Sequence, residues 1–554
     1  MKKRTFYLLL GLSLGFLLCF TSIYLVNRKI TTETITKAST LLGINFTPAE
    51  KDSMITGLKR NRKRYETLDS LDLKNSVPPA LVFNPVPPGK KFNHKQEKIH
   101  WNIPDTVSMP KDRNKLAYYS IKQLASLIKQ RKISCVALTK FFLNRLNTYG
   151  DTLHAVITMT RKRALRQARK MDKELANGHY RGPLMGIPYT VKDLFAVKGY
   201  KTTWGAAPYK NQRINKTATV VKRLDKAGAI LLAKSTPGAL AMGDVWFGGM
   251  TRNPWNLKQG SSGSSAGPAA TTSAGLVPFS IGTETLGSIV SPSSRTGDTG
   301  LRPTFGRVSR YGVMALSWSM DKVGPIARSA EGDAIVFNAI YGPDGHDQTV
   351  HNLPFNYKEN INLDTVKIGY VKAAFDKKYY NHDRDSLTLA KLREMGAHLV
   401  PIKLPHYHAR AMRIILNAEA ADAFNHLTLS NRDSLLVRQS KNAWPNIFRT
   451  SRFIPAVEYI QANRAREILI QKMDSLMQKV DLYVSPALVG YNLLVTNLTG
   501  NPSVVVPNGF NKNGEPTSIT FNGALYDEAT VLEVAKKYQE ATDFNNKHPK
   551  MFMK

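Results

Sequence analysis

Cysteine is almost missing from this chain, whose 554 residues include only Cys19 and Cys135. Cys19 lies inside an uncharged apolar run, and Cys135 lies in a segment with helical periodicity, so we do not expect the two to pair. The sequence therefore predicts a protein that is not held together by a disulfide. It also excludes metal clusters built on cysteine ligands, and no metal site is assigned.

Acidic residues are scarce as well. The chain has 41 Asp and Glu against 78 Lys and Arg, which gives a formal net charge of +37. A field of this sign attracts nucleic acid, anionic lipid and cell-wall polymers alike. No zinc-finger spacing or basic zipper accompanies the charge, so we expect no specific nucleic-acid partner and favour contact with a membrane or cell envelope.

One long uncharged run stands out, the 21 residues from Phe6 to Val26. About 20 apolar residues span a bilayer as a helix, whereas a cleaved signal peptide has a shorter apolar core followed by small residues. We therefore predict an uncleaved N-terminal transmembrane anchor within residues 1–29, with the rest of the chain on the periplasmic or extracellular side. Cleavage as a signal peptide, which would give a secreted protein, stays open.

Three further regions follow the anchor. Residues 30–111 are polar, basic and rich in proline, which indicates a stalk or an extended wrap around the body. Residues 112–545 alternate helical periodicity, as in Ser120 to Gly150, with short apolar runs such as GIPYTV and GAILLAKS. This alternation predicts one large α/β domain, followed by a tail over residues 546–554.

Two serine motifs match known nucleophile patterns but lack the required context. The stretch Gly263–Gly267 fits the nucleophile elbow G-x-S-x-G, yet the polar residues before it cannot form the hydrophobic strand that such an elbow needs. Ser319 to Lys322 fits S-x-x-K, yet Gly324 and Pro325 follow at once, and no K-T-G or S-D-N completes that set. We reject both motifs.

A third pattern covers most of residues 115–545. The stretch NPWNLKQGSSGSSAGPAATTSAGLVPFSIGTETLGSIV resembles the signature region of the amidase signature family. The resemblance extends upstream through GPLMGIPYTVKDLFAVKG and downstream through TNLTGNPSVVVPNGF, with a signature core at about residues 183–330. It implies an α/β amidase signature fold, in which a large, mixed, twisted central sheet is covered by helices on both faces.

The resemblance also implies a Ser–cis-Ser–Lys catalytic triad. The lysine of the family's VKD falls on Lys192, and the nucleophile of its GGSI falls on Ser288. The bridging serine precedes the nucleophile by 24 positions, which selects Ser264. In the family a cis peptide bond precedes this serine, and Gly263 leaves room for it. Ser265 matches a position that supports the bridging serine by hydrogen bonding.

The chemistry of this triad can be argued from the side chains themselves. A serine hydroxyl is a weak nucleophile that needs a base within hydrogen-bond reach. A lysine serves as that base only when it is neutral, although its ordinary pKa is about 10.4. Burial lowers a lysine pKa, and Lys192 lies between the apolar runs IPYTV and LFAV. We therefore expect Lys192 to be buried and to exchange a proton with Ser288 through Ser264.

The resemblance implies an oxyanion hole as well, formed by backbone N–H groups of Thr285, Leu286, Gly287 and Ser288. This chain departs from the family's GTDTGGSIR at three positions, with Glu284 for Asp, Leu286 for Gly and Val290 for Arg. The first and last changes suggest the linked loss of one ion pair. Leu286 would distort the oxyanion hole if that position required backbone angles open only to glycine.

We therefore expect an amidase that hydrolyses non-peptide C–N bonds of linear amides and needs no metal or organic cofactor. Its expected partners are a small-molecule or peptide amide substrate and the membrane, reached through the N-terminal helix, and a homodimer stays open. Two alternatives remain: an amidotransferase A-type glutaminase subunit, which shares this signature, and a non-catalytic binding protein on the membrane surface. The sequence does not identify the substrate.

Overall fold

The computed structural model describes residues 29–405 and 407–554, which fall into two compact units divided between Leu73 and Lys74. The predicted anchor, Phe6 to Val26, lies outside the described residues. Among the residues that are described, no helix combines the length and the apolar composition that a membrane span requires. The placement of the two units relative to one another is not determined, and each is described by itself.

The first unit contains two helices, α2 (Thr32–Leu42) and α3 (Pro48–Asp69). Thr31 and Thr47 cap them through reciprocal capping boxes, with partners Thr34 and Glu50. From the sequence we expected a stalk or an extended wrap over residues 30–111, and these helices were not predicted. The prolines on which that expectation rested lie downstream, mostly after residue 77.

The rest of the proline-rich region, in the second unit, runs over the domain without regular structure from residue 74 to 112. Amide side chains tie it down at both ends. Asn75 exchanges hydrogen bonds with the backbone of Ala315, at 2.8 Å in each direction. Gln96 does the same with Phe355, at 2.9 and 3.0 Å. These bonds satisfy loop backbone groups that no strand or helix pairs.

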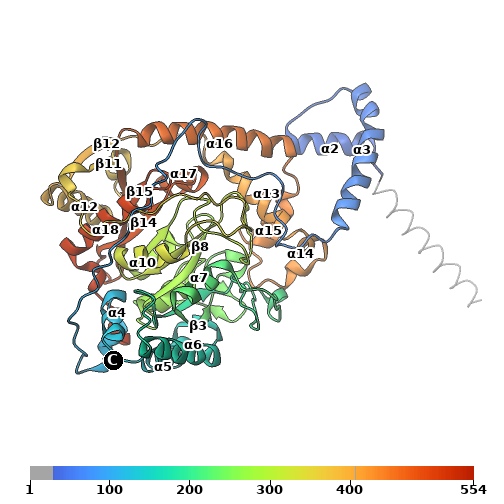
Figure 1. Ribbon diagram of the computed structural model, residues 1–554. Coiled ribbons are helices and arrows are strands. Elements are labelled where there is room, and N and C mark those ends of the chain that lie inside the picture. The colour runs from blue at the N-terminus through green and yellow to red at the C-terminus, as the bar shows by residue number, and fades with distance from the viewer. Residues whose placement is uncertain (1–28, 406) are drawn as a thin grey trace, which may run out of the picture. The chain divides into compact units, whose positions relative to one another are not determined.

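A mixed sheet of eleven strands forms the centre of the second unit (Figure 1). In spatial order the strands are β1 (Val156–Met159), β3 (Ile230–Ser235), β2 (Pro188–Lys192), β8 (Phe279–Glu284), β10 (Lys322–Ala327), β9 (Thr299–Arg302), β14 (Ser503–Phe510), β15 (Pro516–Gly523), β13 (Leu482–Pro486), β11 (Lys367–Val371) and β12 (His398–Ile402). The pairs β3–β2, β2–β8, β13–β11 and β11–β12 are parallel, and the other pairs are antiparallel. The expected α/β fold with a large mixed sheet is confirmed.

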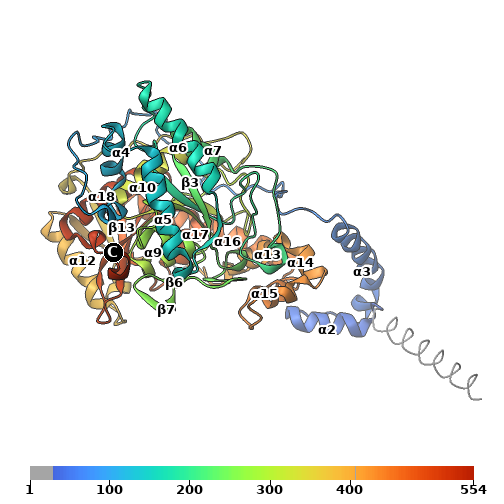
Figure 2. The same ribbon diagram turned by 90° about the horizontal axis from the view of Figure 1, so that it is seen from below.

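Helices surround this sheet (Figures 1 and 2). They are α4 (Ile121–Lys129), α5 (Cys135–Leu153), α6 (Arg161–Ala176), α7 (Thr219–Ala227), α8 (Ala266–Ser273), α9 (Val290–Thr296), α10 (Ala330–Ile340), α11 (Lys372–Phe375), α12 (His382–Glu394), α13 (Ile414–Ala423), α14 (Asn425–Leu429), α15 (Trp444–Ser451), α16 (Ala456–Met477), α17 (Asn492–Thr499) and α18 (Glu528–Thr542). Two small ribbons lie between β3 and α8, namely β4–β5 (Val245–Trp246, Gly249–Met250) and β6–β7 (Arg252–Asn253, Asn256–Gly260).

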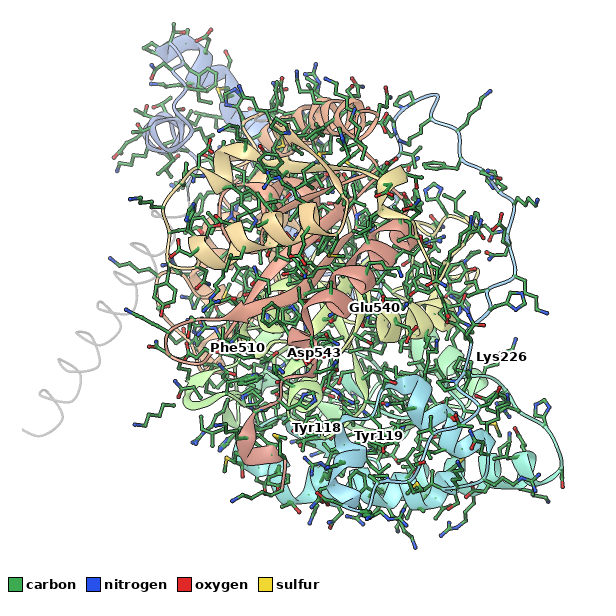
Figure 3. The ribbon with its side chains drawn as sticks, turned by 90° about the vertical axis from the view of Figure 1, so that its left-hand side faces the viewer. Tyr118, Tyr119, Lys226, Phe510, Glu540 and Asp543 are labelled. Atoms are coloured by element: carbon green, nitrogen blue, oxygen red, sulfur yellow. The ribbon has the colours of Figure 1, made fainter. Side chains whose placement is uncertain are left out.

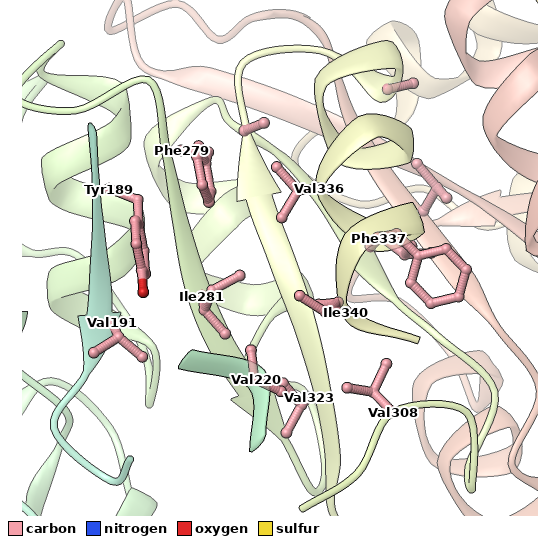
Figure 4. Packing of buried hydrophobic residues seen from close by; sticks show 14 of the residues in the cluster. Tyr189, Val191, Val220, Phe279, Ile281, Val308, Val323, Val336, Phe337 and Ile340 are labelled. Atoms are coloured by element: carbon pink, nitrogen blue, oxygen red, sulfur yellow. The ribbon is translucent and has the colours of Figure 1, made fainter. Parts of the chain in front are cut away.

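Alternation along β8 shows how the sheet separates two layers. Phe279 and Ile281 belong to an apolar cluster with residues of α10, among them Phe337 (Figure 4). Ser280 between them instead hydrogen-bonds at 2.9 Å to Thr272 of α8. Because successive strand residues point to opposite faces, α8 lies on the face of β8 opposite to Phe279 and Ile281, while α10 packs on the neighbouring strands β10 and β9. The side of the strand that faces α8 is the polar side, and it leads to the site.

Candidate active site

Lys192 is the last residue of β2, a strand that is buried along its whole length. Its Nζ lies 2.8 Å from Ser264 Oγ and 3.1 Å from Ser265 Oγ. It also lies 2.9 Å from Thr283 Oγ1 and 3.3 Å from the Thr283 carbonyl oxygen. Three segments that are distant in the sequence therefore meet at one amine.

The surroundings of Lys192 favour the neutral form of its amine. The side chain is fully buried, and none of the ion pairs among the described residues involves it. Burial lowers the pKa of Lys192 well below its ordinary value, while the more distant charges of Asp321 and Glu284 act in the opposite direction. A lysine that contacts hydroxyl groups instead of carboxylates is suited to accept a proton near neutral pH.

The peptide bond between Gly263 and Ser264 is cis, as the resemblance implied. A Cβ on Gly263 would lie only 1.9 Å from the Gly243 carbonyl oxygen, so a side chain cannot be accommodated there. Ser265 exchanges hydrogen bonds with Thr283 on β8, its Oγ donating to the carbonyl oxygen at 3.0 Å and accepting from the N–H at 3.2 Å. The small residues of this stretch thus allow close packing against β8.

Ser288 lies in the turn between β8 and α9 and is 7% exposed. Its carbonyl oxygen accepts a hydrogen bond at 3.0 Å from the N–H of Ser265, which holds this turn against the segment that carries Ser264. The Ser288 hydroxyl makes no hydrogen bond to another described residue. Ser264 Oγ accepts a hydrogen bond from Lys192, and the backbone of Ser288 is bound to the adjacent Ser265, so the segments that carry the three predicted residues pack together. The proton relay from Ser288 through Ser264 stays a prediction.

The turn also presents unpaired backbone donors. Within the part of the chain that the structure describes, the N–H groups of Thr285, Leu286, Gly287 and Ser288 donate to no acceptor. Gly287 has a φ of 88°, whereas Leu286 has a negative φ. Leu286 therefore does not occupy the glycine-only conformation of this turn, and its side chain packs partly buried against the core.

Glu284 has a partner that the sequence did not reveal. Its carboxylate accepts from the N–H groups of Ile289 and Val290 at 2.8 and 2.9 Å. It also pairs with Arg302 at 3.1 Å and accepts from Asn497 at 2.8 Å. Glu284 thus forms a buried ion pair with Arg302, while Val290 offers it only a backbone N–H. The linked loss of an ion pair between positions 284 and 290 stays a hypothesis.

The charge of Glu284 is maintained by these contacts. Burial alone raises the pKa of a carboxyl group, but the Arg302 guanidinium and the backbone N–H of Val290 outweigh burial and lower the pKa of Glu284 below its ordinary value. A stable carboxylate thus holds the first two residues after Ser288. Its effect on α9 is that of an N-terminal cap.

Two further residues of the site were missed at the sequence level. Thr283 provides Lys192 with two oxygen atoms, and Asp321 on the neighbouring segment accepts at 2.5 Å from the hydroxyl of Thr285. Asp321 Oδ2 also accepts the N–H groups of Leu316 and Ser317. Thr283 lies only five residues before Ser288, so its place in the same motif could have indicated it. Nothing in the sequence links Asp321 to Thr285.

The rejected S-x-x-K motif does not assemble. Ser319 donates to Glu419 at 2.7 Å and accepts from Arg466 at 2.9 Å. Lys322 lies on β10, and its amine donates to the backbone oxygen of Met320. Serine and lysine of this motif therefore serve separate buried networks.

A cavity of about 300 Å³ opens elsewhere on the domain, between α10, α18 and the segment after α18. Tyr118, Glu540 and Asp543 line it, and Figure 3 shows them on one face of the molecule. None of its lining residues belongs to the Lys192 cluster. Of its charged groups, Lys536 pairs with Glu540 at 2.7 Å, whereas Arg328 donates to the backbone oxygens of Val277 and Tyr119. This cavity takes no part in the site.

Known proteins resemble this chain over most of its length. The family model described as Amidase matches residues 137–492. The A-type subunit of glutamyl-tRNA(Gln) amidotransferase from Coxiella burnetii is 32% identical over 481 residues, covering 78% of this chain and 99% of that protein. Its counterpart from Acinetobacter baumannii is 34% identical over 480 residues, covering 77% and 97%. The solved structure of native peptide amidase from Stenotrophomonas maltophilia has a TM-score of 0.69 and 28% identity, and the match covers 78% of this chain and 98% of that one.

Proposed function

This chain belongs to the amidase signature family, and we propose that it hydrolyses a carboxamide C–N bond through an acyl-enzyme on Ser288. The observation that carries the proposal is the fully buried Lys192 amine, which lies 2.8 Å from Ser264 Oγ. A buried lysine without a carboxylate partner is costly to keep charged, which suits it to act as a base.

In the proposed acylation step, Ser288 Oγ attacks the amide carbon and forms a C–O bond. The Ser288 proton passes to Ser264, and the Ser264 proton passes to Lys192. Collapse of the tetrahedral intermediate breaks the C–N bond, and the proton returns along the same route to the leaving nitrogen. Water then attacks the acyl-enzyme with the same relay as base, releasing the carboxylic acid and restoring Ser288.

The unpaired N–H groups from Thr285 to Ser288 support an oxyanion hole in this turn. Each donor of this kind contributes about 2.7–4 kcal/mol to stabilisation of the transition state. The proposed chemistry uses only side chains, backbone and water, without a metal or organic cofactor. We propose a non-peptide C–N bond of a linear amide as the bond that is cleaved.

The names of the curated relatives favour a second candidate, a glutaminase subunit of an amidotransferase. Such a subunit would release ammonia from glutamine by the same acyl-enzyme chemistry. The 21-residue uncharged run at Phe6–Val26 favours instead an enzyme anchored in a membrane with its catalytic domain outside the cytoplasm, or secreted after cleavage. Glutaminase activity that depends on a co-purified second subunit would support the amidotransferase assignment.

A fluorophosphonate probe tests the proposed nucleophile. We expect the probe to label the wild-type chain covalently and not to label Ser288→Ala. Ser294→Ala, six residues further along the same turn and helix, is the matched control and should label like the wild type. Absence of labelling of the folded wild-type protein would overturn the proposal in favour of a binding protein.

A further inference from the structure

The start of α16 exposes an apolar face. Val457 and Ile460 are 72% and 57% exposed, and Phe453, in the turn before the helix, is 67% exposed. None of residues 456–461 is buried, whereas the later turns of α16 bury residues such as Leu469. Single exposed apolar side chains are common, but three large ones gathered at one helix start indicate an interaction site.

The elements that precede α16 expose apolar side chains as well. Leu429 at the end of α14, Leu435 in the 3₁₀ helix η6 (Arg432–Leu435) and Val437 are each about half exposed. Helix α15, which leads into Phe453, packs against both α14 and η6. Figures 1 and 2 show α14 and α15 together at the same end of the domain.

Exposed basic residues lie in the same stretch of the chain as these apolar ones. Residues 425–464 contain six Lys and Arg, all exposed, against two acidic residues. The basic residues are Arg432, Arg438, Lys441, Arg449, Arg452 and Arg464. Of the two acids, Asp433 is buried and paired with Arg449 at 2.7 Å, which leaves Glu458 as the exposed one. This part of the domain therefore combines exposed apolar side chains with exposed basic ones.

We propose that this α14–α16 face docks on an anionic phospholipid bilayer, with the apolar side chains entering the headgroup region. The combination of exposed apolar side chains and exposed arginines matches how peripheral proteins bind anionic lipid. A second copy of this chain fits poorly, because two such faces would place one net positive surface against another. A nucleic acid would match the charge but leave the apolar side chains without contacts.

The test uses the full chain reconstituted into vesicles of mixed phosphatidylcholine and phosphatidylglycerol. An environment-sensitive fluorophore is attached at Val457→Cys, and Leu387→Cys is the matched control. Leu387 is 56% exposed on α12, at the other end of the domain (Figure 1). Cys19 is replaced by Ser, while Cys135 stays in place because its thiol is buried and burial raises its pKa.

We expect a blue-shifted emission at position 457 that lipid-attached nitroxides quench about fivefold more strongly than at position 387, since only the former enters the bilayer. The combined variant Arg438→Gln, Lys441→Gln and Arg464→Gln should reduce this quenching. Equal quenching at the two positions would overturn the proposal. A blue shift without quenching by lipid nitroxides would assign the face to a protein partner or a second copy, and equal quenching in vesicles without phosphatidylglycerol would remove the role of anionic lipid.

Discussion

At the scale of single residues, the site depends on the absence of a counter-charge beside one amine. Lys192 contacts the hydroxyl groups of Ser264, Ser265 and Thr283 and no carboxylate. Had one of these been an aspartate, the lysine would stay protonated and could not act as a base. The nearest acidic groups that affect its pKa, Asp321 and Glu284, are instead held by other partners.

The pH dependence of activity follows from this environment. A base works in its neutral form, so kcat/KM should fall as the pH drops below the folded-state pKa of Lys192, which burial has lowered. We expect kcat/KM to level off well below about pH 10.4, the ordinary lysine value. A rate that climbs about tenfold per pH unit up to that pH would contradict the assignment.

Lys192→Ala should lose most activity at neutral pH.

We expect Glu284 to act as a positioning residue for Ser288, because its carboxylate holds the N–H groups of the two residues that follow Ser288. Glu284→Asp shortens the side chain by one methylene, so it cannot reach both following N–H groups and Arg302 at once. We expect kcat to fall about 10- to 100-fold with little change in KM, because a misplacement of about 1 Å is costly. The measurement is steady-state kinetics on a simple amide.

The double variant Glu284→Asp, Val290→Arg is the control for this experiment. It restores the residue pair of the family pattern at these two positions, and we expect it to recover part of the lost kcat. Full activity of the single variant Glu284→Asp would show that the turn holds its shape without the carboxylate. Thermal melts of all variants separate loss of folding from loss of positioning.

At the scale of elements, the apolar runs predicted the strands near the site well. GIPYTV, GAILLAKS and NPSVVVPNGF became β2, β3 and β14. The helical periodicity from Ser120 to Gly150 corresponds to two helices, α4 and α5, and α5 continues past Gly150 to Leu153. A Cβ on Gly150 would make only an ordinary contact, 3.4 Å from Val156, so the structure shows no packing need for this glycine, which lies within the last turn of α5 and does not end it.

The tail after α18 is an element in its own right. Phe552 is fully buried and packs edge-on against Tyr149 of α5. Arg145 of the same helix donates to the carbonyl oxygens of Phe552 and Lys554. Residues 546–554, predicted only as a short tail, therefore dock on α5. The periodicity of helix and tail taken separately contains no sign of this contact.

Phe552→Ala should lower the free energy of unfolding by about 3–4 kcal/mol, because it empties a buried aromatic site. The neighbouring Met553 is exposed, so Met553→Ala is the control and should change stability by less than about 0.5 kcal/mol. Chemical denaturation followed by tryptophan fluorescence measures both. Equal small effects would mean that the tail is detached in solution.

At the scale of the whole molecule, the uncharged N-terminal run bears on whether the protein is anchored in a membrane. If the Phe6–Val26 run is an uncleaved anchor, the full chain should stay in the membrane fraction after carbonate washing and be released by detergent. Deletion of residues 1–28 should remove the carbonate-resistant pool, whatever weaker contact the α14–α16 face makes. A soluble mature chain that begins near residue 27 would identify a cleaved signal instead.

The motifs of the sequence identified the family, and the resemblance they carry predicted the three side chains of the proposed triad. The small residues around Ser264, the apolar residues on either side of Lys192 and the turn at Ser288 are each stretches of consecutive residues. The backbone of each stretch restricts which side chains fit there, so the sequence alone displays the pattern. Residue order also predicted the α/β class, since hydrophobic periodicity reflects which face of each element is buried.

Which charged residues lie near the site became clear only from the tertiary structure. Glu284 pairs with Arg302 and caps α9, and Asp321 holds Thr285, because strands β8, β9 and β10 lie side by side. The tertiary structure also placed Phe552 against α5 and left Val457 exposed on α16. Such pairings depend on the distance between segments far apart along the chain, and no local pattern of residues encodes that distance.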